Sequence, residues 1–230
     1  MKDRAIFKLI TNVIIFSIVA VVGAVSFFNY DSIGKATIAP SRGGSIDSGV
    51  VSIVFKPVGD DNVLKALEIL QEREVSATFF LSGKWCIENP KILTEIVEKN
   101  HEIGNHGYLN RDFSSLSYKE CLDEIKTTER TIENLCGYKT KLFMPPKGKF
   151  SDATSTSCVT LGYKMVLWSR NAFGEDSEEV YELATKEILS GEIVLLSLNE
   201  PTLSILDDII ECYTNNGLQI KSVSTNITAK

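Results

Sequence analysis

Two kinds of apolar pattern alternate along residues 50–223 of this chain. Continuous β-branched runs, such as VVSIVF at residues 50–55, are typical of strands buried on both faces of a sheet. Other segments have apolar residues at helical spacing, as residues 63–70 do after the capping candidates Asp60, Asp61 and Asn62. Strands are predicted at residues 50–55, 76–81, around Ile103, 142–143, 163–168, 192–198 and 218–223. Helices are predicted at residues 63–70, 91–99, 117–135, 152–161, 177–189 and 202–215.

This alternation predicts an α/β fold with a parallel sheet that is either open or closed into a barrel. In such folds, ligands bind at the carboxyl ends of the strands, in the loops that follow. The candidate site is therefore formed by the residues just after Phe55, Leu81, Ile103, Phe143, Trp168 and Leu196.

The N-terminal segment has a different pattern. Residues 9–28 (LITNVIIFSIVAVVGAVSFF) contain no charged residue, and 20 residues of helix are long enough to cross a bilayer core. Lys2, Arg4 and Lys8 precede this segment. They predict a single-pass anchor in the cell membrane, with the C-terminal domain extracytoplasmic. A signal peptide cleaved near Ala24 is the alternative, and the protein would then be secreted.

The chain is predicted to have four parts. Residues 1–8 form a cytoplasmic N-terminus and residues 9–28 the anchor or signal segment. Residues 29–49 are polar and rich in Gly and Ser, which indicates a flexible linker. Residues 50–230 are long enough for one globular domain with a hydrophobic core.

The exported part is acidic. Removing Lys2, Arg4, Lys8 and Asp3 from the 24 basic and 30 acidic residues leaves 21 against 29, a net charge of −8. This charge disfavours nucleic acid and anionic wall polymers as the main partner, and leaves a neutral glycan or a protein.

The cysteines do not indicate a disulfide framework. The chain has five cysteines and no CxxC pair, and the odd count leaves at least one thiol unpaired within the chain. We interpret them as free thiols that act as small apolar side chains. They are Cys86, Cys121, Cys136, Cys158 and Cys212.

Five stretches occur in the order and spacing of a known family. They are SATFFLSGKW, NPKILTEIVEKNHEIGNHGYLNRDFSSLS, LFMPPKG, VLWS and GEIVLLS. Over residues 50–225 the chain resembles the polysaccharide deacetylases, the NodB-homology group or carbohydrate esterase family 4. The resemblance implies a distorted (β/α) barrel with a groove for an N-acetylated glycan such as peptidoglycan or chitin. Small anchored members occur in Gram-positive bacteria and several are associated with spores, so a sporulation role is also implied.

The resemblance also implies a chemistry. In active members an Asp and two His hold a divalent ion, usually zinc, which has open positions for water and substrate. A second Asp takes a proton from the water, and a later His protonates the leaving amine.

The first motif of the family, Thr-Phe-Asp-Asp-Gly-Pro, is altered. Lys56 stands at the position of the base and Pro57 at that of a metal ligand. Asp60 and Asp61 come too late in the chain to replace this pair, and we interpret them as capping residues of the next helix.

The other motifs are altered as well. His-x-x-x-His has become His106 and Asn110, and a neutral amide is a poor zinc ligand. Met144 replaces the arginine and Lys147 the tyrosine of the proline-rich loop. Ser197 stands at the position of the general acid.

Of the remaining family positions, one is kept and others are altered. Trp168 is kept, the next stretch (SRNAF) lacks the family's aspartates, and Asn171 stands near one of them. His101 falls where the family residue is not a ligand, so a helix-end or packing role is expected.

These losses predict a pseudoenzyme that binds cell-wall glycan, above all peptidoglycan, or a wall-acting partner without catalysis. No catalytic residue and no resident metal are expected, and His106 is interpreted as a remnant of the metal site. The expected groove residues are Lys56, Tyr108, Asn110, Met144, Lys147, Trp168, Asn171 and Ser197. Two alternatives remain: a residual deacetylase using zinc or another divalent ion, and an assembly protein for a cell-wall or spore-coat complex.

Overall fold

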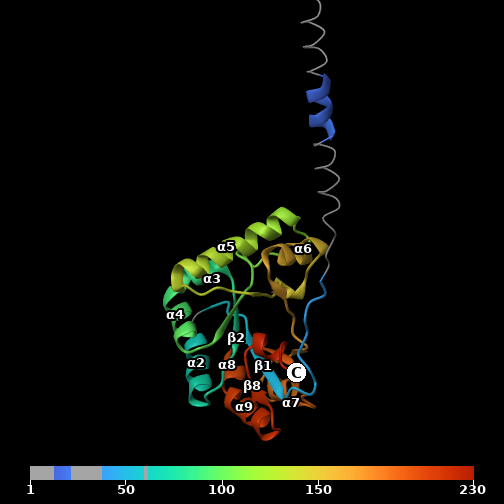
Figure 1. Cartoon of the computed structure of the whole chain (residues 1–230). Coiled ribbons are helices and arrows are strands. Elements are labelled where there is room, and N and C mark those ends of the chain that lie inside the picture. Colours follow the sequence, from blue (N-terminus) through green and yellow to red (C-terminus); the bar gives the residue numbers. More distant parts are fainter. Residues whose placement is uncertain (1–12, 22–37, 60–61) are drawn as a thin grey trace, which may run out of the picture. The chain divides into compact units, whose positions relative to one another are not determined.

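The computed structural model describes residues 13–21, 38–59 and 62–230 (Figure 1). Thr37–Lys230 forms one compact unit, and the described residues that precede it, 13–21, are helical. Within the described ranges, no helix has both the length and the apolar character needed to span a bilayer. The anchor predicted at residues 9–28 lies partly outside these ranges and stays a prediction.

The described residues contain one eight-stranded sheet in which every pair of neighbouring strands is parallel (Figure 1). The predicted parallel sheet is therefore confirmed. The strand order is β5 (Lys164–Met165), β4 (Leu142–Phe143), β3 (Glu102–Asn105), β2 (Thr78–Leu81), β1 (Val50–Phe55), β7 (Ile193–Leu196) and β6 (Arg170–Asn171), and β8 (Gln219–Ile220) pairs with the start of β1.

The sheet is curled into a half-barrel. β5 and β6 lie at opposite edges of the strand order, yet only residues 166–169 separate them in the chain. So short a connection spans at most about 18 Å, and the two edges must therefore curve toward each other. Ser41 forms a parallel bridge with Val166, and Gly43 an antiparallel bridge with Glu192. Ser41 and Gly43, which fall in the predicted linker, are thus paired with the sheet.

Helices cover the outside of the curled sheet because their apolar stripes need a hydrophobic partner, except the last helix, whose Val223 packs with Val54 on the other face. They are α2 (Val63–Glu72), α3 (Gly83–Glu88), α4 (Pro90–Glu98), α5 (Tyr118–Cys136), α6 (Asp152–Leu161), α7 (Ser177–Thr185), α8 (Glu200–Leu203), α9 (Leu206–Asn215) and α10 (Val223–Asn226). A capping box joins Ser117 to Glu120 at the start of α5, and Gly137 ends this helix with a φ of 72°.

The central strand β1 supplies side chains to two separate cores, because successive residues of a strand point to opposite faces. Val51, Ile53 and Phe55 pack in the main core with the helices. Val54 belongs to a smaller cluster on the other face of the sheet, where Trp168 packs against it. This alternation accounts for the unbroken apolar run in the sequence.

Some elements differ from the sequence prediction. The helix expected at residues 202–215 is divided into α8 and α9, and α3 was not predicted. Asn62 does not cap α2 with its side chain, because its Nδ2 donates to the carbonyl of Leu198 at 2.8 Å. Asp60 and Asp61, interpreted as capping residues, lie outside the described residues.

The interpretation of the cysteines as buried free thiols agrees with the structure at three of the five positions. All five lie within the described residues and are free thiols. Cys86, Cys121 and Cys158 are buried, while Cys136 and Cys212 are half-buried.

Candidate functional site

A cavity of about 380 Å³ lies at the carboxyl ends of β1, β2 and β3, where the sequence predicted a site. Its size falls within the range of small-molecule sites, about 300–1,000 Å³. Its lining consists of Lys56, Pro57, Val58, Ser82, Lys84, Trp85, Glu88, His106, Leu109, Asn110, Lys147 and Phe173. A second cavity of about 330 Å³ shares Lys56, Val58 and Phe173 with the first and extends toward Ser197.

Lys56 is the first residue after β1, and its side chain reaches between two aromatic rings. The Nζ atom lies 4.9 Å from the ring centroid of Trp168 and 5.7 Å from that of Phe173. Burial lowers the pKa of Lys56. A cation over an aromatic face gains about 0.5–2 kcal/mol, which offsets part of this loss of solvation. The lysine therefore covers the ring of Trp168 that was expected to stack on a sugar.

His106 follows β3 directly and is only 6% exposed. Its Nδ1 lies 2.7 Å from the carbonyl oxygen of Met144. A carbonyl only accepts, so Nδ1 carries the proton and Nε2 is left as an acceptor. Burial, and then the charge of Lys56, lower the pKa of His106 to about 3, although the bond to Met144 opposes this change. His106 is therefore neutral at pH 7.

Asn110 and Lys147 line the cavity from two different loops, and both have left-handed backbones. Their φ angles are 57° and 58°, and both side chains are exposed. A left-handed conformation costs a residue with a Cβ about 1–2 kcal/mol. For Lys147 it occurs inside the short turn Pro146–Gly148 that follows β4.

Ser197, at the position of the general acid, is engaged in a helix cap. Its Oγ lies 2.9 Å from Oδ1 of Asn199 and 2.8 Å from Oγ1 of Thr202. Asn199 in turn accepts from the backbone N–H of Thr202 at the start of α8. The hydroxyl thus supports a helix N-terminus beside the second cavity.

Four residues expected in the groove lie outside the lining of both cavities. Tyr108 packs against Gly83, where an added Cβ would lie 2.3 Å from its Cδ2. Met144 is fully buried and acts through its carbonyl. Trp168 is half-buried beneath Lys56, and Asn171 is exposed on β6, paired with Leu195. The structure therefore does not bring these four side chains to the lining of either cavity, because side-chain direction depends on backbone geometry that spacing does not reveal.

The residues at the family's metal-ligand positions do not fit a zinc centre. Pro57 offers no donor atom, Asn110 offers a neutral amide, and His106 is left as a single imidazole, whereas zinc sites use several imidazole, thiolate or carboxylate ligands. In the part of the chain that the structure describes, no group of three or more His, Cys, Asp or Glu side chains could hold a metal ion. Residues 60–61 are outside that part.

Several lining residues were not predicted. Trp85 is buried on α3, and its Nε1 donates to the carbonyl of Gly59 at 2.9 Å, which fixes the start of the loop after β1. Ser82 caps α3 by accepting from the N–H of Trp85. Ser82 comes just after Leu81, so the rule about strand ends pointed to it, but the short helix that positions Trp85 left no signal.

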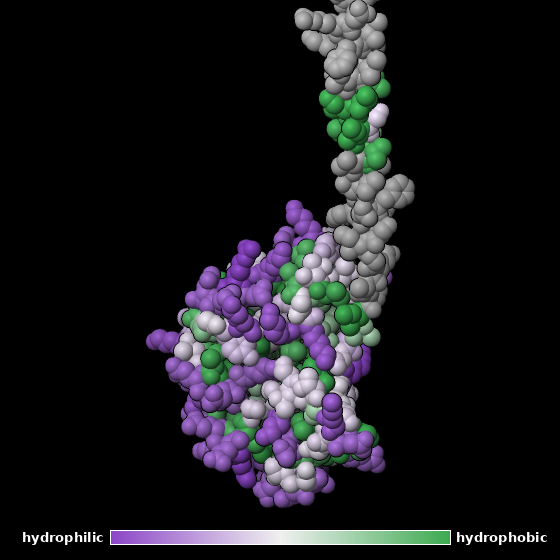
Figure 2. Space-filling view, viewed as in Figure 1, coloured by the Kyte–Doolittle hydropathy of each residue, from purple (hydrophilic) through white to green (hydrophobic). Residues whose placement is uncertain are grey.

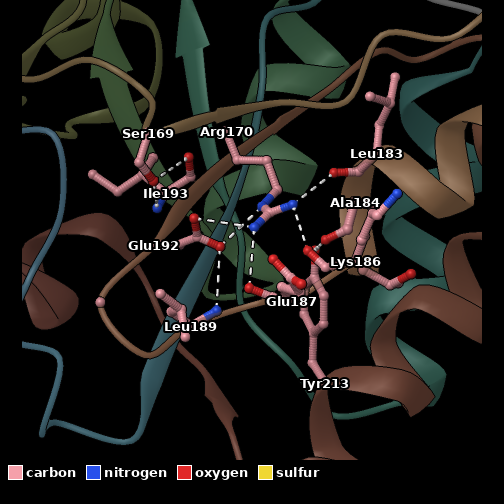
Figure 3. Close-up of polar contacts among 12 residues, drawn as sticks. Ser169, Arg170, Leu183, Ala184, Lys186, Glu187, Leu189, Glu192, Ile193 and Tyr213 are labelled. Atoms are coloured by element: carbon pink, nitrogen blue, oxygen red, sulfur yellow. Dashed lines mark hydrogen bonds and ion pairs between the residues drawn. The ribbon is translucent and has the colours of Figure 1, made fainter.

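The wall that carries Phe173 is held by the half-buried guanidinium of Arg170. Nε and Nη2 of Arg170 donate to Glu192 at 2.9 and 3.2 Å (Figure 3). Nη1 of Arg170 donates to the carbonyls of Leu183 and Lys186 at 3.1 and 2.9 Å. These carbonyls lie at the end of α7, where helices leave acceptors unpaired. Arg170 thereby ties β6 to β7 and α7.

Comparisons with known proteins agree with this fold. A model of the polysaccharide deacetylase family matches residues 44–166. YlxY of Bacillus subtilis is 29% identical over 189 residues, covering 80% of this chain and 59% of that protein. The peptidoglycan-N-acetylmuramic acid deacetylase PdaA of Bacillus subtilis is 27% identical over 169 residues, covering 69% of this chain and 64% of that protein.

A solved structure with the same fold is of particular interest. It is a CE4 family pseudoenzyme from Bacillus anthracis, with a TM-score of 0.79 and 27% identity, covering 82% of this chain and 69% of that one. A mutant of the pseudoenzyme is described as having restored enzymatic activity.

Residues 38–59 and 62–230 have the curled parallel half-barrel of the NodB type, with a cavity at the carboxyl ends of its strands. The chain belongs to the polysaccharide deacetylase family. It spans about 59% and 64% of the two curated relatives described above.

Proposed function

We propose that this protein is a membrane-anchored, extracytoplasmic pseudoenzyme that binds cell-wall glycan, above all peptidoglycan, in the cavity after β1, β2 and β3 and does not deacetylate it. The proposal combines the family membership with the altered residues of the site. A wall-acting protein partner at the same face is the second form that such a role can take.

The observation that carries the proposal is the position of the Lys56 ammonium. It lies at the end of β1, where the family resemblance places the catalytic base, and its charge lowers the pKa of His106. A divalent ion at His106 would be repelled by this ammonium, and a lysine cannot replace a carboxylate as base while it is protonated. Met144 and Ser197 are equally unable to supply the missing arginine and acid.

A relative supports the proposed absence of catalysis. The Bacillus anthracis protein at 27% identity is a pseudoenzyme of the same family, and a mutant of it has restored activity. A deacetylase fold can therefore persist without catalysis in a protein similar to this one.

The predicted anchor is supported by the character of the helical residues 13–21. Their apolar side chains are exposed, and the face seen in Figure 2 is largely green. A helix whose exposed surface is mostly apolar suits a membrane rather than water. The exposed residues are Val13, Ile14, Ile15, Phe16, Ile18, Val19 and Val21.

The test uses the full-length chain, purified in detergent and supplied with zinc. We expect no acetate release from N-acetylated peptidoglycan, together with co-sedimentation of the protein with insoluble peptidoglycan. Bovine serum albumin serves as the control for non-specific sedimentation. Acetate release that is abolished by His106→Ala would establish the residual deacetylase instead. Absence of both acetate release and glycan binding would leave the assembly role.

A further inference from the structure

The lining of the cavity is locally cationic in a chain whose formal net charge is −6. Lys56, Lys84 and Lys147 face one acidic residue, Glu88. His106 adds no charge because it is neutral at pH 7. Among the described residues that line the adjoining cavity, Lys56 alone is charged. The local charge is therefore opposite in sign to that of the whole chain.

Two of these lysines have no carboxylate partner in the described part of the chain. Lys84 pairs with Glu88 at 3.7 Å. Neither Lys56 nor Lys147 takes part in an ion pair among residues 38–59 and 62–230. Lys56 is also partly desolvated, so an anion beside it would restore an interaction that water no longer supplies.

The position of Lys147 is maintained at a conformational cost. Its φ of 58° is unfavourable for a residue with a Cβ, and Gly148 follows it with a φ of 68°. Strained backbone of this kind is found where a side chain serves a binding site. The turn places the exposed Lys147 side chain in the lining of the cavity that also contains Lys56.

Apolar surface surrounds the two cations. Val58, Leu109 and Phe173 are 90%, 54% and 46% exposed, and all three line the cavity. Ligand sites combine such apolar walls with a few polar groups that fix orientation. Apolar faces suit the rings of a saccharide, while the two ammonium groups suit a negative group carried by it.

We propose that the cavity selects a saccharide that carries a carboxylate, and that Lys56 and Lys147 bind this carboxylate. The inference rests on the proposed glycan-binding function and adds the charge of the ligand. It also revises the expectation of a neutral glycan, because the net charge of the chain does not describe its cavity.

The experiment measures binding of peptide-free saccharides to the full-length chain by tryptophan fluorescence. Both tryptophans of the chain report on the site, since Trp85 lines the cavity and Trp168 lies under Lys56. The probes are an oligosaccharide of alternating N-acetylglucosamine and N-acetylmuramic acid, the same saccharide with its carboxylates converted to methyl amides, and an N-acetylglucosamine oligomer of equal length. The first should bind about tenfold more tightly than the others, the effect of one strong charge-assisted contact.

The variants assign this preference to its residues. Lys147→Gln and Lys56→Met should each reduce the preference for the carboxylate to near unity, and 0.5 M NaCl should weaken it through screening. Lys149→Gln is the matched control, because Lys149 lies two residues from Lys147 but pairs with Asp112 at 3.5 Å and does not line the cavity. It should retain the preference.

Three results would overturn the inference. Equal affinity for the carboxylate and methyl amide saccharides would remove it while leaving glycan binding intact. Competition by the free stem peptide as strong as that by the saccharide would place the recognised anion on the peptide. Absence of binding to every saccharide would remove the proposed glycan-binding function itself.

Discussion

The Lys56 ammonium lies 4.9 Å from the centroid of the Trp168 ring, and the two residues are 112 positions apart in the chain. This contact joins the end of the inner strand β1 to the segment between the two edge strands β5 and β6. It brings a positive charge to the place where the family resemblance calls for carboxylates.

Protonation of the two histidines should destabilise the fold in weak acid. Burial lowers the pKa of His101 to about 4 and that of His106 to about 3, whereas an unfolded histidine titrates near 6.5. The unfolded chain therefore binds more protons below pH 6.5, so stability falls as the pH decreases from about 6.5 toward the folded values. Urea unfolding at pH 7 and pH 5 should show a lower free energy of unfolding at pH 5. A histidine resonance that titrates near pH 6.5 in the NMR spectrum of the folded protein would contradict this prediction.

Removing the charge of Lys56 should raise the pKa of His106. The Lys56 charge is the second cause of the lowered value, after burial. Lys56→Met keeps an unbranched apolar side chain against Trp168 and Phe173 but has no ammonium. NMR titration of His106 should show an upward change in its pKa, while that of His101, which is lowered by burial and Lys99, should not move. An unchanged His106 value would remove the electrostatic link between the two residues.

Lys147→Gly should stabilise the protein while it weakens carboxylate binding. Glycine adopts a φ of 58° without the Cβ clash, and the gain should be about 1 kcal/mol after its larger unfolded-state entropy is deducted. Lys149→Gly is the control, because Lys149 has an ordinary φ of −97° and should lose stability. Urea unfolding measures the free energy of unfolding of both variants. A loss of stability in Lys147→Gly would show that the left-handed turn is not strained.

Arg170→Met should destabilise the fold by about 2–3 kcal/mol, because it leaves the Glu192 carboxylate without its cationic partner and the carbonyls at the end of α7 without the donors of Arg170. The Arg170 and Glu192 side chains are 20% and 18% exposed. Arg73→Met is the comparison, since Arg73 and its partner Asp207 are 37% and 50% exposed, and exposed pairs contribute little. Thermal unfolding should show a clearly larger decrease in Tm for Arg170→Met. Equal decreases in Tm for the two variants would show that the Arg170 contacts contribute no more than an exposed ion pair.

Zinc retention should depend on replacing several residues together. The unaltered chain should lose zinc on dialysis, because Pro57 and Asn110 supply neither a carboxylate nor an imidazole beside His106. The triple variant Lys56→Asp, Pro57→Asp, Asn110→His supplies these donors and removes the repelling ammonium. It should retain about one zinc ion per chain by atomic absorption. Stoichiometric zinc in the unaltered chain would refute the prediction.

The sequence by itself determined the family and most of the alternation of strands and helices, although α3, β6 and α10 were not predicted. Continuous apolar runs and helical spacing reflect local burial, and burial of this kind is recorded in the periodicity of the chain. β1, α4, α5 and α6 therefore agree with their predictions within one or two residues. The sequence also determined which donor groups exist, because no arrangement of the chain can turn Pro57 or Asn110 into a metal-binding imidazole or carboxylate.

The tertiary structure decided which of these residues face the cavity. Lys56, His106, Asn110 and Lys147 line it, whereas Tyr108 turns toward Gly83 and Asn171 faces outward from β6. Those directions depend on left-handed turns, on helix α3 and on the curvature of the sheet, none of which leaves a periodic signal. The charge of the cavity was hidden for the same reason. The net charge sums over the whole chain, but a ligand meets only the side chains that folding brings to one place.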